Sequence, residues 1–245
     1  MRLAHIEKRE RESRFQYLED HLFNVAMGAK VLTDTIGQGD ILFLLGLYHD
    51  LGKSERLFQK KMKEEPSLHV DHSYAGARYL FQEIEQVFQR SGRNPNDAQL
   101  FREIIAYIIS AHHGVYDVPL PEDMEGAGRY RYSKLFYRIG QPRADYHYEE
   151  DIKAYAKLLE EQLPSFGYQN VDDLVMKSFE NFQTAWAKLC INDDSESAFY
   201  SSCFIRLYLS YLKNADILDT INAYGLLVEP LKQEEKRELN KSYLE

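Results

Sequence analysis

His49 and Asp50 are the residues of the chain whose types and positions most directly suggest chemistry. They follow the apolar run from Ile41 to Tyr48 and precede Gly52, a residue type that commonly ends helices. If the run is helical, the two side chains project about 100° apart. The imidazole can then hold one metal ion while the carboxylate reaches that ion and a second one. A single His-Asp pair is weak evidence, so the rest of the chain must supply further ligands.

Further ligand-type side chains occur at expected helix ends and on helical faces. The full set is His21, His49, Asp50, His72, His112, His113 and Asp216. Each has a structural alternative when taken alone: a half-buried helix histidine, a residue at a helix end or a solvated acid. Together, imidazole and carboxylate suit first-row ions such as Mn²⁺, Fe²⁺, Co²⁺, Ni²⁺ and Zn²⁺ better than Mg²⁺, which prefers oxygen ligands.

The size of this set favours two ions. Five histidines and two aspartates fill most of two octahedral shells and leave positions for water and a phosphate oxygen. Two ions about 3.5–4 Å apart clamp both oxygens of an in-line phosphoryl displacement and lower the pKa of the attacking water. The residue chemistry therefore predicts phosphoester hydrolysis at a helical two-metal site.

The elements that must position these side chains are expected to be helices. Apolar residues at three- and four-residue spacing predict helices over 17–36, 41–48, 73–89, 97–109, 149–163, 171–191 and 201–223, with a short one after Lys53. The charged stretch 1–14 is expected to be irregular, and no strand alternation is evident. The fold class is therefore all-α. We expect an N-terminal segment over 1–16, one domain over 17–228 and a charged tail or linker over 229–245.

Composition limits the class of protein. The 245 residues, 44% hydrophobic and 28% charged, are typical of a globular chain that can bury a full core. No apolar run approaches the roughly 18 residues of a membrane span, and the charged start does not resemble a signal peptide, so a cytoplasmic location without membrane contact is expected. Cys190 and Cys203 form neither a disulfide framework nor a zinc motif.

The net charge of −9 argues against broad electrostatic attraction to nucleic acid. One tract, Arg129 to Arg138 with Arg143 beyond it, interleaves cations with aromatic residues. Such tracts line the binding paths of single-stranded nucleic acids. The alternative is an amphipathic helix with a basic outer face.

The order His21, His49-Asp50 and Asp216 resembles the HD superfamily of metal-dependent phosphohydrolases. The finer pattern resembles the HD nuclease of type I CRISPR systems, the nuclease part of their helicase-nuclease. Five segments over nearly the whole chain carry it: His21–Ala26, Leu47–Lys53, Val70–Ala77, Ala111–Gly114 and Asn214–Asp216. The adjacent pair His112-His113 followed by glycine is the most discriminating of them.

The resemblance implies a single-domain helical bundle of the HD type with a buried two-metal site. It assigns one ion to His21, His49, Asp50 and Asp216. It assigns a second ion to Asp50, His72, His112 and His113, so that Asp50 bridges the two. Lys53 is implied as a cation that supports a ligand or faces a phosphate, the alternative being a solvated lysine.

Two further residues near the motifs are less clearly assigned. His69 competes with His72 for a ligand position, although the residues after His72 favour His72. Asp219 lies one helical turn past Asp216, where it either supports a ligand or faces solvent.

The implied function is a metal-dependent nuclease that degrades single-stranded DNA in CRISPR antiviral defence. Its implied partners are a CRISPR helicase, fused or separate, and the DNA-recognition complex. The chain has no phosphate-binding Gly-rich loop with Lys-Ser/Thr, so no ATPase of its own is expected. Two other functions stay open: an HD phosphohydrolase acting on nucleotides or cyclic dinucleotides, and a non-catalytic module that docks on the helicase or the recognition complex.

Overall fold

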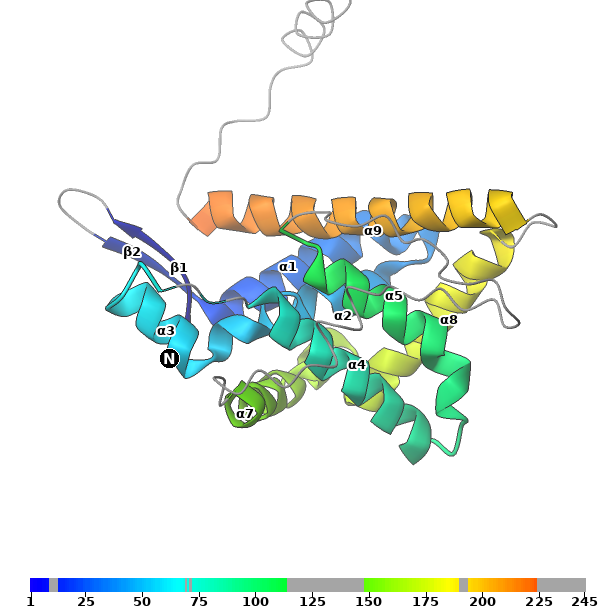
Figure 1. The fold of residues 1–245 in the computed structure, drawn as a ribbon, viewed down its shortest axis with the longest axis horizontal. Helices are drawn as coiled ribbons and strands as arrows, with labels where there is room; N and C mark the ends of the chain where they lie inside the picture. The colour runs from blue at the N-terminus through cyan, green and yellow to red at the C-terminus, as the bar shows by residue number, and fades with distance from the viewer. Residues whose placement is uncertain (9–12, 69, 71, 114–147, 190–193, 224–245) are drawn as a thin grey trace, which may run out of the picture.

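The computed structural model describes residues 1–8, 13–68, 70, 72–113, 148–189 and 194–223. Within these ranges the chain is a bundle of helices with one short hairpin at its N-terminal end (Figure 1). The all-α fold predicted from the sequence is confirmed. The basic and aromatic tract over 129–143, His69 and the charged tail over 229–245 lie outside the described residues.

The helices fall close to the predicted ranges. They are α1 (Leu18–Thr33), α2 (Gly39–Tyr48), α3 (Arg56–Lys63), α4 (Ser73–Arg90), α5 (Gln99–Ser110), α7 (Tyr148–Glu160), α8 (Val171–Leu189) and α9 (Asp194–Ala223). Short 3-10 turns connect several of them: η1 (Asp34–Ile36), η2 (Leu51–Ser54), η3 (Pro95–Ala98) and η4 (Leu163–Phe166).

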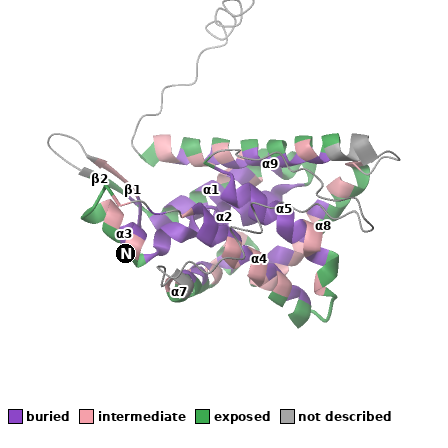
Figure 2. Ribbon diagram, in the orientation of Figure 1, coloured by how far each residue is buried: buried purple, intermediate pink, exposed green. Residues whose placement is uncertain are grey.

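Helix α2 forms the centre of the core. Its residues from Ile41 to Tyr48 are all buried, which explains why this segment is apolar on every side. Helices α1, α5, α8 and α9 contact it, and the buried residues gather around it in Figure 2. The C-terminal end of α2, where His49 and Asp50 follow, is therefore enclosed by several other helices.

Close packing between α1 and α2 depends on Gly46. A Cβ atom at this position would lie 2.6 Å from the Cα of Ala26. The two helices therefore approach more closely than a larger residue allows, which brings the first turn of α1 near the end of α2. This approach places His21 beside His49, with ring centroids 5.2 Å apart.

The N-terminal segment differs from the prediction. Instead of being irregular, it forms the antiparallel strands β1 (Leu3–Lys8) and β2 (Ser13–Tyr17). The alternation in β2 is inverted, because Phe15 and Tyr17 are exposed while Gln16 is buried. The inverted pattern has a physical reason, since Gln16 donates a hydrogen bond to a buried carboxylate of α9.

None of the described helices is both long enough and apolar enough to cross a membrane.

Candidate metal centre

Asp50 lies where helix ends from distant parts of the chain converge. Helix α2 ends at Tyr48, His49 is its C-cap, and Asp50 immediately precedes the turn η2. The Asp50 side chain is only 1% exposed. Its two oxygen atoms face two different groups of histidines, which we call the Oδ1 cluster and the Oδ2 cluster.

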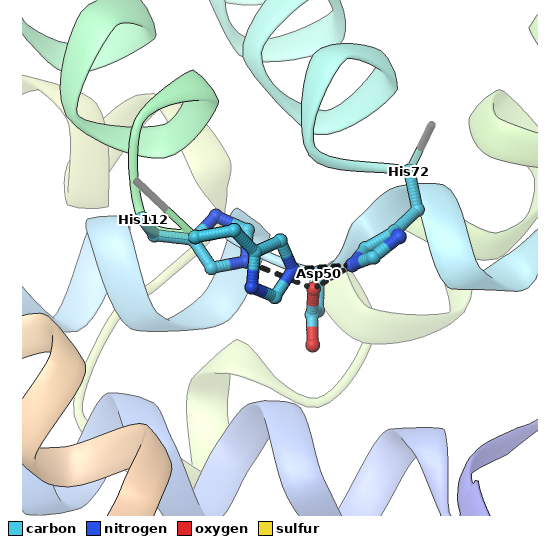
Figure 3. Close-up of side chains that lie close together, drawn as sticks. Asp50, His72 and His112 are labelled. Carbon is cyan, nitrogen blue, oxygen red and sulfur yellow. Dashed lines mark hydrogen bonds and ion pairs between the residues drawn. The ribbon is translucent and has the colours of Figure 1, made fainter. Parts of the chain in front are cut away.

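The Oδ1 cluster contains His72, His112 and His113. His72 Nε2 lies 3.2 Å and His112 Nε2 3.3 Å from Asp50 Oδ1, and the two rings approach it from opposite sides (Figure 3). His113 joins the cluster through its Nε2, 2.6 Å from His72 Nε2. His72 is the N-cap of α4, and the other two follow the end of α5. Contact between α4 and α5 therefore assembles this cluster.

The Oδ2 cluster contains His21, His49 and Asp216. His21 Nε2 and His49 Nε2 lie 3.3 Å and 3.4 Å from Asp50 Oδ2. The same two nitrogens lie 3.5 Å and 3.7 Å from Asp216 Oδ1. Helix α9 brings Asp216 to this place by packing along α1.

Lys53 is part of the centre. Its side chain is buried, and its Nζ donates to Asp50 Oδ2 at 2.6 Å. The alternative of a solvated lysine is therefore wrong. The turn η2 creates this contact, because it folds Lys53 back over the residue that precedes the turn.

Hydrogen bonds behind the histidines fix their orientation. His49 Nδ1 donates to the carbonyl of Gly46 at 2.7 Å, and His112 Nδ1 donates to that of Ile109 at 2.6 Å. A carbonyl oxygen only accepts, so both rings carry a proton on Nδ1 and present Nε2 to the centre. Such supporting bonds are typical of metal-ligating histidines.

His21 is supported by Asp219. The Asp219 Oδ2 lies 2.7 Å from His21 Nδ1, and the same carboxylate accepts from Gln16 Nε2 at 2.6 Å and from Asn24 Nδ2 at 2.9 Å. Of the two possibilities left by the sequence, Asp219 thus supports a ligand-type residue. A carboxylate behind a histidine raises its basicity and fixes its tautomer.

The Oδ2 cluster favours positive charge. Burial alone would lower the pKa of His49, but the Asp50 and Asp216 carboxylates outweigh it and raise this pKa to about 10. Burial opposes ionisation of Asp50 as well, yet Lys53 and His49 hold the pKa of its carboxyl well below the usual range. In the absence of an ion, protons and Lys53 therefore supply the positive charge that the two carboxylates require.

Two imidazoles of the Oδ1 cluster, those of His112 and His113, are kept neutral. Burial lowers the pKa of His112, although Asp50 opposes the shift. Although His113 is exposed overall, partial desolvation of its ring and the neighbouring His112 lower the pKa of His113 to about 4. Neutral imidazole is the form that binds a metal ion.

Several buried nitrogen and oxygen atoms of the centre are free to act as metal ligands, as the donor set implies. His49 Nε2, Asp50 Oδ1 and His112 Nε2 are buried without a hydrogen-bond partner in the described part of the chain. Buried polar atoms are normally satisfied, and divalent ions held at the two clusters would satisfy these three. The donor atoms form two groups, and within each group all of them lie within 4.8 Å of one another. One group is Asp50, His72, His112 and His113, and the other is His5, His21, Asp50 and Asp216.

His5 is the one residue of these groups that the sequence analysis missed. It lies on β1, and its Nε2 accepts a hydrogen bond from Lys53 Nζ at 3.1 Å. Burial and the charge of Lys53 lower the pKa of His5 to about 3, so the ring is neutral. Its position within an expected irregular segment gave no spacing signal. Recognising the hairpin would have been the only way to find it.

The structure thus brings together all seven residues of the predicted ligand set, and Lys53 with them. Their arrangement can hold a metal ion. The assignment of each residue to a particular ion, the number of ions and the identity of the metal stay predictions.

Comparison with known proteins identifies the family. No curated protein matches the chain. The family model described as HD domain matches residues 18–162, which is more than half of the chain and includes every predicted ligand except Asp216. HD domains bind divalent metals and are generally metal-dependent hydrolases. The chain therefore belongs to the HD-domain family.

Proposed function

We propose that the protein is a metal-dependent phosphodiesterase that cleaves single-stranded DNA. The observation that carries this proposal is the pair of clusters that share Asp50, one on each of its carboxylate oxygens. The generic HD pattern of His21, His49-Asp50 and Asp216 accounts only for the Oδ2 cluster and Asp50. The three additional histidines of the Oδ1 cluster supply a second set of donors beside the first, as two-metal phosphodiester hydrolysis requires.

The residues of the chain have distinct roles in this proposal. The Oδ2 cluster would hold one divalent ion and the Oδ1 cluster the other, with Asp50 as the shared ligand. When bound, such ions supply Lewis acidity for the hydrolysis of a phosphodiester. Lys53 keeps the Asp50 carboxylate ionised and oriented, and Asp219 keeps His21 in the tautomer that presents Nε2.

The accessibility of the centre supports a polymeric substrate. His113 is exposed, whereas Asp50 beside the cluster is 1% exposed. Among the residues that the structure describes, the donors therefore reach the surface at His113, where a phosphate of a long strand can approach. The resemblance to the CRISPR nuclease, carried by His112-His113-Gly114, favours single-stranded DNA over free nucleotides. The CRISPR role, the helicase and the DNA-recognition complex as partners rest on that resemblance alone.

The experiment uses the chain stripped of metal by a chelator and then supplied with Mn²⁺, Co²⁺ or Ni²⁺. Circular single-stranded DNA is the main substrate, because its cleavage shows endonuclease activity. Deoxynucleoside triphosphates and cyclic dinucleotides are offered in parallel. We expect cleavage of the circle with at least one metal, and a loss of about 10³-fold or more in the Asp50→Asn variant.

The matched control is Glu180→Gln, which removes an exposed carboxylate from the middle of α8. It should cut like the wild type. No cleavage with any metal, or undiminished cleavage by Asp50→Asn, would overturn the proposal. Turnover of a nucleotide or cyclic dinucleotide in place of DNA would replace it with the alternative HD activity.

A further inference from the structure

His5 approaches the Oδ2 cluster from an element that the HD match does not include. The match begins at residue 18, and β1 ends at Lys8. Even so, donor atoms of His5, His21, Asp50 and Asp216 lie within 4.8 Å of one another. The rings of His5 and His21 meet edge to face, with centroids 5.1 Å apart.

Hydrogen bonds hold strand β1 next to the metal centre, so the position of His5 near the donors is a feature of the fold. The side chain of Gln59 holds Leu3 from both sides: it accepts from the Leu3 N–H at 2.9 Å and donates to the Leu3 carbonyl at 2.8 Å. The same amide donates to the carbonyl of Lys53 at 2.7 Å. Ala4 is 1% exposed. One buried side chain thus joins the start of the strand to the turn that carries Lys53.

The second strand of the hairpin also serves the Oδ2 cluster. His5 is paired with Gln16 in the register of the two strands, next to an irregularity between Leu3 and His5. Gln16 donates to Asp219, the carboxylate behind His21. The hairpin therefore places His5 among the donor atoms and Gln16 in contact with Asp219, which supports His21. This coincidence on neighbouring positions would be unexpected for a hairpin with a purely structural role.

The orientation of the His5 ring suits a metal ligand. The Lys53 ammonium has no acceptor, so His5 Nε2 must be the acceptor in the contact between them. The lone pair of His5 Nε2 therefore points at Lys53 Nζ, which itself lies 2.6 Å from Asp50 Oδ2. A cationic group thus lies between His5 and the shared carboxylate.

We propose that His5 is a further ligand of the ion held by His21, His49, Asp50 and Asp216. The chain would then offer this ion five ligand residues. His5 would give up its hydrogen bond from Lys53 in order to bind the ion, and Lys53 would still lie beside the Asp50 carboxylate. The inference rests on the two-metal centre of the proposed function, but it is independent of DNA as the substrate.

The test measures metal binding and does not depend on turnover. The full chain is stripped of metal, titrated with Co²⁺ and followed by visible absorption and by equilibrium dialysis. The wild type should bind two ions. His5→Ala should bind one of them at least about 10-fold more weakly, with an altered cobalt spectrum for that ion, while the other binds normally.

The matched control is Ile6→Ala, since Ile6 is the next residue of β1 and strand alternation directs it to the opposite face. It should keep both affinities and the cobalt spectrum. Thermal unfolding in chelator verifies that both variants fold. A folded His5→Ala variant with wild-type affinities and spectrum would overturn the inference, as would a wild type that binds no ion. A wild type that binds two ions, loses one affinity with His5→Ala and cuts no DNA would overturn the proposed function alone.

Discussion

Asp50 connects the two clusters because each of its oxygens faces different histidines. Replacing it with asparagine keeps the shape and removes the charge. We expect Asp50→Asn to lose both ions, measured as metal content after dialysis. The free energy of unfolding should also fall by about 3 kcal/mol, because buried Lys53 loses the carboxylate 2.6 Å from its Nζ.

A second variant separates these two effects. Asp50→Asn combined with Lys53→Met removes the buried charge pair together, so most of the lost stability should return. Metal content should stay low, because the shared ligand is still absent. Recovery of metal binding in the double variant would show that Asp50 supports the fold and is not the shared ligand.

Asp219 acts through His21, with which it shares a contact of 2.7 Å. In Asp219→Asn the charged support is lost, because a neutral amide oxygen accepts the hydrogen bond of His21 Nδ1–H more weakly than a carboxylate. We expect the affinity for one Co²⁺ ion to fall about 10- to 100-fold, with the other unchanged. Equal weakening of both ions would instead indicate a general loss of structure, which chemical denaturation would detect.

At the scale of elements, the Oδ1 cluster depends on the approach of η2 to the start of α4. A Cβ atom at Gly52 would lie 1.9 Å from the carbonyl oxygen of His72. We therefore expect Gly52→Ala to displace His72 and to destabilise the protein by about 1–3 kcal/mol, measured by denaturant unfolding. Metal affinity at the Oδ1 cluster should fall with it.

Gly28 offers the matched control for that substitution. Its added Cβ would meet only the Cβ of Ala215, at the ordinary contact distance of 3.6 Å. Because alanine is the better helix former, Gly28→Ala should be neutral or stabilising by up to about 1 kcal/mol. A comparable loss of stability in both variants would contradict the argument from close packing.

The sequence was informative about elements wherever hydrophobic periodicity was strong. The helices around residues 18–33, 73–90 and 171–189 were predicted within a few residues, because one face of each is apolar. The hairpin was missed because its strands are short and charged. In β2 the apolar side chains face solvent and a glutamine faces inward, so the usual rule for strands would have placed the wrong face inside.

In the candidate site, the individual ligand-type residues could be predicted from the sequence, but their grouping in space could not. Residues that follow a helix end, such as His49 and His112, stood out through their sequence context. That His49 would meet Asp216 of α9, and His112 the carboxylate of Asp50, could not be derived from spacing, because tertiary packing alone brings them together. The resemblance to the HD superfamily supplied that grouping. His5 had no such support, since it lies outside both the periodic segments and the motif.

At the scale of the whole molecule, stability should depend on pH through Glu55. Burial and the nearby Asp151 raise the pKa of this carboxyl from 4.5 to about 7. Between these values the folded protein holds a proton that the unfolded chain releases, so the free energy of unfolding falls as pH rises from about 4.5 to 7. Above that range Glu55 is ionised in both the folded and the unfolded chain, and the free energy of unfolding stays at its lowered value.

Glu55→Gln should remove this dependence. Relative to the wild type it should gain about 2 kcal/mol of unfolding free energy at pH 8, after allowance for solvent screening, and almost nothing near pH 4.5. Denaturant unfolding at several pH values measures the difference. Glu180→Gln on the exposed side of α8 should follow the wild-type curve. A gain that is independent of pH would assign the effect to packing and not to ionisation.

Metal removal should act on the molecule as a whole, because the donors come from β1, α1, the end of α2, the start of α4, the end of α5 and α9. An ion bound only by the folded chain stabilises it by about 2.7 kcal/mol at a free concentration 100 times its Kd. For a chain of this size that amounts to roughly 5–10 °C in Tm for each ion. Thermal unfolding in Mn²⁺ and in chelator measures the shift.

The comparison with Mg²⁺ and with Asp50→Asn makes the metal experiment specific. Because both clusters contain at least two imidazoles, Mg²⁺ should raise the Tm much less than Mn²⁺ at the same concentration. The Tm of Asp50→Asn should not respond to either ion. An equal response to both ions, or a full response in Asp50→Asn, would place the bound metal elsewhere on the chain. A large response confined to Mn²⁺ and the wild type would mean that one buried carboxylate links helices nearly 200 residues apart through the ions it shares.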